Sequence, residues 1–260
     1  DEIERFMHAP GYNKENISDY LLEVFWDSKK EVFSVKGKID TVIYIRSTHH
    51  GPIVTDIHHL ATGENTVLSM AWTGHWITNE LDAWVELTTM KDWDDFSTAL
   101  SKFGVPGQNI VYADIDGNIG WRPAVYIPIR KAGFSMVPRP GWYSTYDWDG
   151  MVPYEDMPFM YNPESGYIAT ANNRTIDMNF PYYISGLWAD PSRASRIVDM
   201  LNEKEKYDIE DMKSIQLDLT SNFSKEILPY ILDNTGEIKD RAHQRAIDFL
   251  KDWNHVESIE

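Results

Sequence analysis

The first part of the chain carries short apolar runs that are typical of β-strands. Residues 41–45 are β-branched or aromatic throughout, and residues 67–72 form a mostly apolar run bounded by glycines. β-Branched and aromatic residues pack well on a pleated surface, and a short apolar run between turn residues indicates a buried strand. We therefore expect residues 20–73 to be mainly strands, and the strand at 67–72 to be buried.

Helical periodicity replaces this pattern over residues 81–102. Asp92 precedes apolar residues at helical spacing, and aspartate is a preferred residue for capping the first turn of a helix. Gly104 and Pro106 then stop the run, because neither residue continues a helix well. The residues expected on the apolar face are Trp93, Phe96, Leu100 and Phe103.

The next segment predicts a β-hairpin and then a long packed loop. Residues 110–121 contain two apolar runs joined by Asp116-Gly117, a dipeptide that tolerates the positive φ of a tight turn. Residues 123–163 follow with seven prolines, several glycines and several aromatic side chains. Loop regions of this length usually shape a site.

The last part of the chain predicts helices. Asp190-Pro191 is typical of a cap followed by proline at the first helical position. Four apolar stripes at helical spacing follow, and Pro229 is expected to start or kink the third. The stripes consist of Ile197, Met200 and Leu201; Ile209, Met212 and Ile215; Ile227, Leu228, Ile231 and Leu232; and Ala242, Ala246, Phe249, Leu250 and Trp253.

Strands come first and helices last, and this order predicts an α+β fold. No internal repeat and no low-complexity linker divides the chain, so we expect a single incomplete domain over residues 1–260. Within it, residues 1–185 are predicted to be β-rich and to carry the pocket loops. Residues 186–260 are predicted to be helical.

Composition excludes several classes of function. The 260 residues are 42% hydrophobic and 13% aromatic, which is enough for a substantial core. The net charge of −17 argues against nucleic acid as a partner, because phosphate recognition needs a basic face. The absence of cysteine excludes disulfides, thiolate zinc sites and a cysteine nucleophile. No apolar run approaches the roughly 20 residues of a membrane helix, so we expect no membrane partner.

Two histidine pairs, His49-His50 and His58-His59, raise the question of a zinc site, because imidazole is the commonest metal ligand. No HExxH helix accompanies them, and the first pair precedes Gly51-Pro52 where a strand ends. Adjacent residues of a strand face opposite sides, so each pair offers at most one ligand per face. We therefore favour a structural role and predict no metal site.

Asp114, Asp116 and Asn118 imitate the opening of a calcium-binding EF-hand loop. That loop also needs glycine at its sixth position and an acidic residue at its twelfth, and these positions hold Ile119 and Val125. A plain hairpin turn is the better interpretation. The chain also lacks the Gly-x-Ser-x-Gly and Ser-x-x-Lys strings of serine hydrolases, so these patterns identify no nucleophile.

The string Thr48-His49-His50-Gly51-Pro52-Ile53-Val54 resembles a signature of the penicillin acylase family, the Ntn hydrolases that also include acyl-homoserine-lactone acylases. Further strings follow in the order that this family has, and ordered matches from about residue 48 to 197 make the resemblance specific. These strings are Ala71-Trp72-Thr73-Gly74, Gln108-Asn109-Ile110-Val111-Tyr112-Ala113-Asp114, Gly117-Asn118-Ile119-Gly120, Pro138-Arg139-Pro140-Gly141-Trp142, Trp148-Asp149-Gly150, Asn162-Pro163-Glu164-Ser165-Gly166-Tyr167-Ile168, Ala171-Asn172-Asn173-Arg174 and Arg193-Ala194-Ser195-Arg196-Ile197.

The resemblance implies a partial Ntn-hydrolase fold of αββα layers, in which stacked sheets lie between helical layers. It also implies an autoproteolytic precursor whose new N-terminal serine attacks the substrate, with its own α-amine as the base. The side chain of Asp1 cannot serve as that nucleophile. We therefore expect an internal fragment of the β chain of an amidohydrolase acting on linear amides, truncated at both ends and inactive alone.

Four residues take functional roles through the resemblance. Asn172 matches the oxyanion-hole asparagine, and Arg193 matches the arginine that orients this asparagine and the serine amine. Trp84 and Gln108 align with positions that line the acyl pocket. Simpler interpretations remain open: a turn asparagine for Asn172, an exposed first-turn arginine for Arg193 and a core aromatic residue for Trp84.

No cofactor is expected. Some members of the family bind calcium through an aspartate shortly before the arginine helix, where this chain has Tyr182 or Tyr183. The expected partners are a small-molecule N-acyl amide and the remainder of the precursor, and the resemblance implies a periplasmic or extracellular location. The alternative function is a non-catalytic module in which an acidic, tryptophan-rich surface binds a sugar or a peptide.

Overall fold

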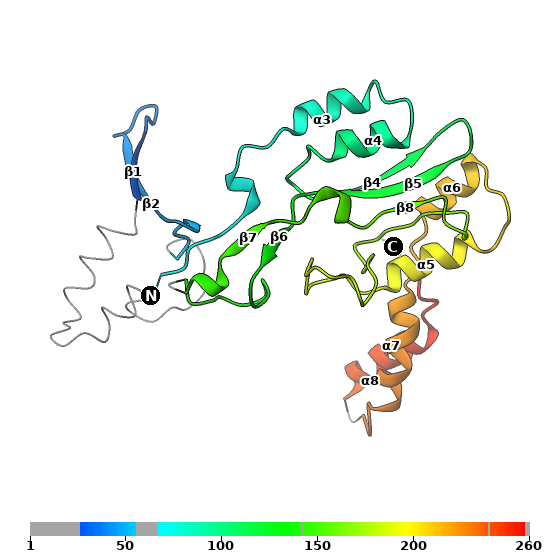
Figure 1. The fold of residues 1–260 in the computed structure, drawn as a ribbon. Helices are drawn as coiled ribbons and strands as arrows, with labels where there is room; N and C mark the ends of the chain where they lie inside the picture. Colours follow the sequence, from blue (N-terminus) through cyan, green and yellow to red (C-terminus); the bar gives the residue numbers. More distant parts are fainter. Residues whose placement is uncertain (1–26, 56–66, 142, 239, 258–260) are drawn as a thin grey trace. The chain divides into compact units, whose positions relative to one another are not determined.

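The computed structural model describes residues 27–55, 67–141, 143–238 and 240–257 (Figure 1). Within these residues, six α-helices, α3 to α8, occur together with small β-sheets. The α+β prediction is therefore confirmed. Among the described residues, no helix combines the length and the apolar character that a membrane span requires.

The chain divides into two compact units. The first comprises Asp1–Asp114, Trp121–Phe159 and Phe180–Gly186, and the second comprises Ile115–Gly120, Met160–Asn179 and Leu187–Glu260. The chain therefore passes from one unit to the other several times. The prediction of one incomplete domain over residues 1–260 stays a prediction.

A three-stranded sheet near the start of the described chain has the order β1-β2-β3. Strand β1 (Asp27–Phe33) pairs antiparallel with β2 (Thr41–Thr48), which pairs with the short β3 (Gly51–Pro52). The strand predicted over residues 41–45 is confirmed. The side chains of residues 41–45 are exposed in the described structure, so burial does not explain why this segment is a strand. Its β-branched residues favour an extended backbone by themselves.

The buried strand predicted at residues 67–72 is wrong. The segment makes only an isolated bridge, between Ile53 and Ser69, supported by backbone hydrogen bonds from Val54 to Leu68 and from Met70 to Pro52. Its neighbour β3 is two residues long, so there is little strand to extend. The apolar side chains that were expected to be buried are instead exposed: Val67, Met70 and Trp72.

The helical region over residues 81–102 consists of two helices, α3 (Glu80–Leu87) and α4 (Trp93–Leu100). The Asp92 side chain accepts a hydrogen bond of 2.9 Å from the Asp95 backbone N–H, so the predicted cap is confirmed. The cap also explains the break, because Asp92 is extended and cannot continue the preceding helix. The core of the first unit gathers around these helices and includes Ala83, Phe96, Leu100, Phe103, Tyr112 and Ala124.

The predicted hairpin is confirmed. Strand β4 (Gln108–Ala113) lies beside β5 (Ile119–Ala124), and a connection this short requires an antiparallel pair. Gly117 has φ +88°, as the tight turn requires. The short strand β8 (Met160–Tyr161) lies on the other side of β5 and completes the order β4-β5-β8.

The proline-rich region 123–163 contains short elements. Strand β6 (Pro128–Arg130) pairs antiparallel with β7 (Trp148–Met151), with a bulge between Pro128 and Arg130. Two 3₁₀ turns, η2 (Ser144–Tyr146) and η3 (Tyr154–Asp156), flank β7, and a third, η1 (Thr73–His75), occurs earlier in the chain. These elements belong to the first unit, which this part of the chain leaves after Phe159.

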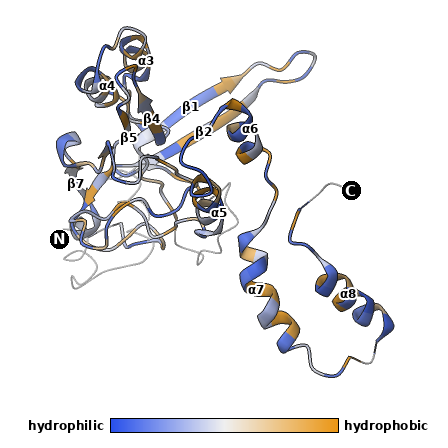
Figure 2. Ribbon diagram, turned by 90° about the vertical axis from the view of Figure 1, so that its right-hand side faces the viewer, coloured by the Kyte–Doolittle hydropathy of each residue, from blue (hydrophilic) through white to orange (hydrophobic). Residues whose placement is uncertain are grey.

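The second unit contains α5 (Ser192–Leu201), α6 (Ile209–Gln216), α7 (Asn222–Asp233) and α8 (Arg241–Asp252). Helix α5 contacts α7, and α7 contacts α8. Apolar and polar segments alternate along α7 and α8 (Figure 2), as expected of amphipathic helices. The predicted helical region is confirmed, and Pro229 lies inside α7 and does not begin it.

Candidate oxyanion-hole site

The second unit places Asn172 in a loop with an unusual backbone. Asn172 has φ +60°, a conformation that asparagine tolerates better than most residues. Its carbonyl accepts a 2.9 Å hydrogen bond from the Ala189 backbone N–H, which joins the two ends of the loop before α5. On its other side, the Asn173 side chain accepts a 3.0 Å hydrogen bond from the Ala171 N–H. The backbone at Asn172 is thus held from both sides.

Arg193, in the first turn of α5, approaches this loop. Its Nη2 donates to the Ala171 carbonyl at 2.8 Å and to the Asn172 Oδ1 at 2.9 Å. The structure therefore brings together two residues that lie 21 positions apart. A guanidinium can only donate, so it binds the amide oxygen and turns the NH₂ group of Asn172 away from the arginine. Both residues are exposed, and that NH₂ group can donate to a ligand.

Helix α5 is anchored at its start and near its middle, which holds Arg193 in position. At its start, the Asp190 carboxylate accepts a 2.9 Å hydrogen bond from the Ser192 N–H, and hydrogen bonds from Ser192 lower the pKa of Asp190. One turn after Arg193, Arg196 donates Nε and Nη2 to the two carboxylate oxygens of Asp218, both at 2.8 Å. This pairing lowers the pKa of Asp218 to about 2.

Trp84 and Gln108 belong to the first unit. Trp84, on α3, is 49% exposed and packs edge-on against Phe103, with ring centroids 5.9 Å apart, so it lies at the margin of the core and not within it. Gln108 is exposed and begins β4. Both residues have surface that a ligand can reach. Their assignment to an acyl pocket stays a prediction, as do the catalytic roles of Asn172 and Arg193.

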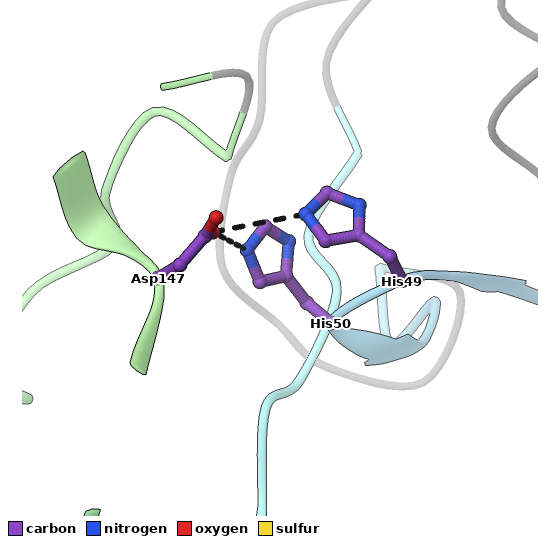
Figure 3. A group of neighbouring side chains, drawn as sticks. All are labelled: His49, His50 and Asp147. Carbon is purple, nitrogen blue, oxygen red and sulfur yellow. Dashed lines mark hydrogen bonds and ion pairs between the residues drawn. The ribbon is translucent and has the colours of Figure 1, made fainter. Parts of the chain in front are cut away.

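The first unit also gathers three possible metal ligands, His49, His50 and Asp147 (Figure 3). The argument that adjacent histidines face opposite sides fails here, because both occupy the turn between β2 and β3 and neither lies in a strand. Both imidazoles therefore point at the same carboxylate. The sequence did not indicate Asp147, which lies 97 positions away from His50. The pair His58-His59 lies outside the described residues.

Tyr182 and Tyr183, one of which was expected to replace a calcium ligand, both have hydroxyl partners. The Tyr182 hydroxyl donates to the Asp156 carboxylate at 2.7 Å, and the Tyr183 hydroxyl lies 3.4 Å from the Ser135 hydroxyl. The hydrogen bond to Asp156 raises the pKa of Tyr182. The expectation of no cofactor stays an expectation.

Comparisons with known proteins agree on one family. The family model described as penicillin amidase matches residues 17–260. Acyl-homoserine lactone acylase QuiP of Pseudomonas fluorescens (strain Pf0-1) is 28% identical over 199 residues, which cover 76% of this chain and 24% of that protein. Penicillin G acylase of Escherichia coli is 32% identical over 183 residues, which cover 69% of this chain and 21% of that protein. The chain thus spans about a quarter of the length of these relatives.

A solved structure supports the fold. Thermostable penicillin G acylase from Alcaligenes faecalis superposes with a TM-score of 0.67 at 22% identity, covering 90% of this chain and 42% of that one. At this identity the likeness concerns the fold alone. It confirms the likeness in fold to penicillin acylases that the sequence strings implied.

Proposed function

The chain belongs to the penicillin amidase family, and from this we propose that the protein containing it hydrolyses an N-acyl amide. In this proposal Asn172 is a donor of the oxyanion hole, Arg193 orients it, and Trp84 and Gln108 contribute to the acyl pocket. The substrate is a small-molecule N-acyl amide, since the relatives named above are acylases. A periplasmic or extracellular location belongs to the same proposal.

The observation that carries the proposal is the hydrogen bond from Arg193 Nη2 to Asn172 Oδ1, at 2.9 Å. This bond fixes which end of the amide is the donor before any substrate arrives. A donor that is already oriented stabilises the negative charge that develops on an attacked carbonyl oxygen without reorganising during the reaction. A turn asparagine that only supported the backbone would not need its side-chain oxygen held by a cation.

The attacking group follows from the family resemblance. We assign it to an N-terminal serine of the processed precursor, contributed by a part of the protein outside these 260 residues. Its α-amine would accept the hydroxyl proton, since the pKa of such an amine lies near neutrality. The serine oxygen bonds to the amide carbonyl carbon, the C–N bond breaks, and the proton held by the α-amine passes to the leaving amine. Water then hydrolyses the acyl-enzyme ester and releases the acid, and the oxyanion hole serves both steps.

Substitution of Asn172 in the complete protein tests the proposal. Asn172→Gly keeps the backbone conformation, because glycine adopts a φ of +60° without strain, and removes only the amide. We expect turnover on phenylacetyl or long-chain acyl amides to fall by roughly a hundredfold, since one oxyanion donor is worth about 3 kcal/mol. The Michaelis constant should change much less.

The matched control is Asn179→Ala, which removes an exposed asparagine from the same connection between β8 and α5. Its turnover should equal that of the unsubstituted protein. Unchanged turnover in a correctly folded Asn172→Gly variant would remove Asn172 from the chemistry. Saturable binding of a sugar or peptide with no hydrolysis of any amide would favour the binding-module alternative.

A further inference from the structure

We propose that His49, His50 and Asp147 bind a divalent transition-metal ion such as Zn²⁺. One ligand atom from each residue lies within 4.8 Å of the other two, and Figure 3 shows both imidazole rings directed at the Asp147 carboxylate. The Nε2 atoms of His50 and His49 lie 2.9 and 3.7 Å from the same oxygen, Asp147 Oδ1. Three ligand atoms thus converge on one point.

The spacing suits a tetrahedral ion. With bonds of about 2.0–2.1 Å, neighbouring ligand atoms of a tetrahedral zinc site lie about 3.3–3.4 Å apart. The two nitrogen-to-oxygen distances, 2.9 and 3.7 Å, fall on either side of this value. Shifts of a few tenths of an ångström would therefore bring both nitrogen-to-oxygen distances to this value.

The donor set selects the class of metal. Two imidazole nitrogens and one carboxylate oxygen suit zinc and its neighbours among the transition metals, whereas calcium and magnesium prefer ligand sets made of oxygen alone. The side chain of His49 is 57% exposed and that of Asp147 is 32% exposed, so water can reach the fourth position. The formal net charge of −17 also favours a cation over an anion at this site.

Both segments that carry the ligands are held by their own local contacts. The His50 backbone N–H donates to the Thr48 hydroxyl at 3.2 Å, which orders the turn. Gly51 follows with φ +138°, and a side chain there would collide with the Met70 carbonyl. Opposite them, Asp147 ends the η2 turn, with its backbone N–H bonded to the Ser144 carbonyl. The cluster therefore joins two ordered segments of the first unit.

A hydrogen bond to Asp147 explains the position of the His50 ring but not that of the His49 ring. His50 can donate to Asp147 at 2.9 Å with no metal present. His49 lies beyond hydrogen-bond distance at 3.7 Å, yet its ring points to the same oxygen and lies 3.7 Å from the His50 ring. A metal ion uses both nitrogens at once, because neutral imidazole presents a lone pair to it. The bound ion would link the turn at His49-His50 to Asp147, the residue before β7.

Zinc titration of the complete, untagged protein, followed by calorimetry, tests the site. We expect one Zn²⁺ to bind per chain and to raise the melting temperature, since an ion that binds only the folded state stabilises it. In His49→Gln we expect the affinity to fall at least about tenfold. This variant leaves the His50 to Asp147 hydrogen bond in place, so the fold should survive.

Two further variants separate metal binding from other effects. Asp147→Asn can still accept a hydrogen bond from His50 but is a poor metal ligand, so it should also lose zinc affinity at least about tenfold. The control is His243→Gln on α8, whose Nδ1 lies 3.8 Å from one carboxylate, Asp240, and whose side chain is 81% exposed. Its zinc affinity should be unchanged. Absence of binding, or binding that neither His49→Gln nor Asp147→Asn weakens, would overturn the proposal.

Discussion

Arg193 shows how much a single side chain can organise, because one nitrogen atom binds both the Ala171 carbonyl and the Asn172 amide oxygen. Lysine at this position has one nitrogen on a more flexible stem and presents no planar fork. In the proposed enzyme the arginine acts through the asparagine, and so it is a positioning residue.

We therefore predict that Arg193→Lys lowers turnover by about tenfold, and Arg193→Ala by about a hundredfold, with a smaller change in the Michaelis constant. The physical reason is that a misdirected donor loses most of its effect on the transition state. Steady-state kinetics on the complete protein measure both constants. Arg245→Ala, an exposed arginine on α8, serves as the control and should be neutral. Equal turnover in Arg193→Ala and unsubstituted protein would contradict the prediction.

At the scale of elements, local signals set where α3 stops and α4 starts. The hydroxyls of Thr88 and Thr89 donate to the Val85 and Glu86 carbonyls at the end of α3, and Asp92 caps α4. Helix α4 in turn places Phe96 and Leu100 in the core. Loss of the Asp92 cap should therefore lower the stability of the first unit.

We predict that Asp92→Ala lowers the free energy of unfolding of the chain by about 1 kcal/mol, the usual value for loss of a side-chain cap. Asp92→Asn should cost little, because asparagine caps a helix as well as aspartate does. Urea denaturation followed by circular dichroism measures both variants. A loss of the same size in both would show that the charge, and not the cap, is what stabilises α4.

At the scale of the whole molecule, each unit contains a carboxylate whose pKa is held far below its usual value. Glu80 in the first unit accepts hydrogen bonds, above all from Thr78 and also from the Gly104 and Val105 backbone, and its pKa is lowered to about 2. Asp218 in the second unit has a pKa of about 2, chiefly because Arg196 donates to it. Both carboxylates connect segments distant in sequence.

These shifts predict acid sensitivity. Because the folded-state pKa lies below the value of 4.5 for Glu80 and 3.8 for Asp218 outside the fold, each carboxylate stabilises the folded state fully above about pH 5. That stability is lost as the pH falls toward 2. The difference in unfolding free energy between the unsubstituted chain and Asp218→Asn or Glu80→Gln should shrink over this window. Urea denaturation at pH 7 and pH 3 measures it, and a difference independent of pH would contradict the prediction.

Predictions from the sequence were confirmed where residues close together in the chain determine the local structure. A few neighbouring residues are enough to predict the cap at Asp92 and the turn at Gly117. The apolar periodicity of each segment is enough to predict the helices after residue 191. The segment 67–72 failed because an apolar run does not show whether a partner strand exists. The candidate roles of Asn172 and Arg193 came from the family resemblance, since neither residue stands out by pattern.

Sequence alone predicted the α+β class, the hairpin at residues 110–121, the helical end of the chain and the family, because these depend on local propensity and on ordered strings of residues. Which distant groups meet follows from the three-dimensional fold. It oriented the Asn172 amide by bringing α5 to a loop 21 positions earlier, and it joined His49 and His50 to Asp147 across most of the first unit. Chain folding sets such contacts, and no local pattern encodes the distance between groups so far apart in sequence.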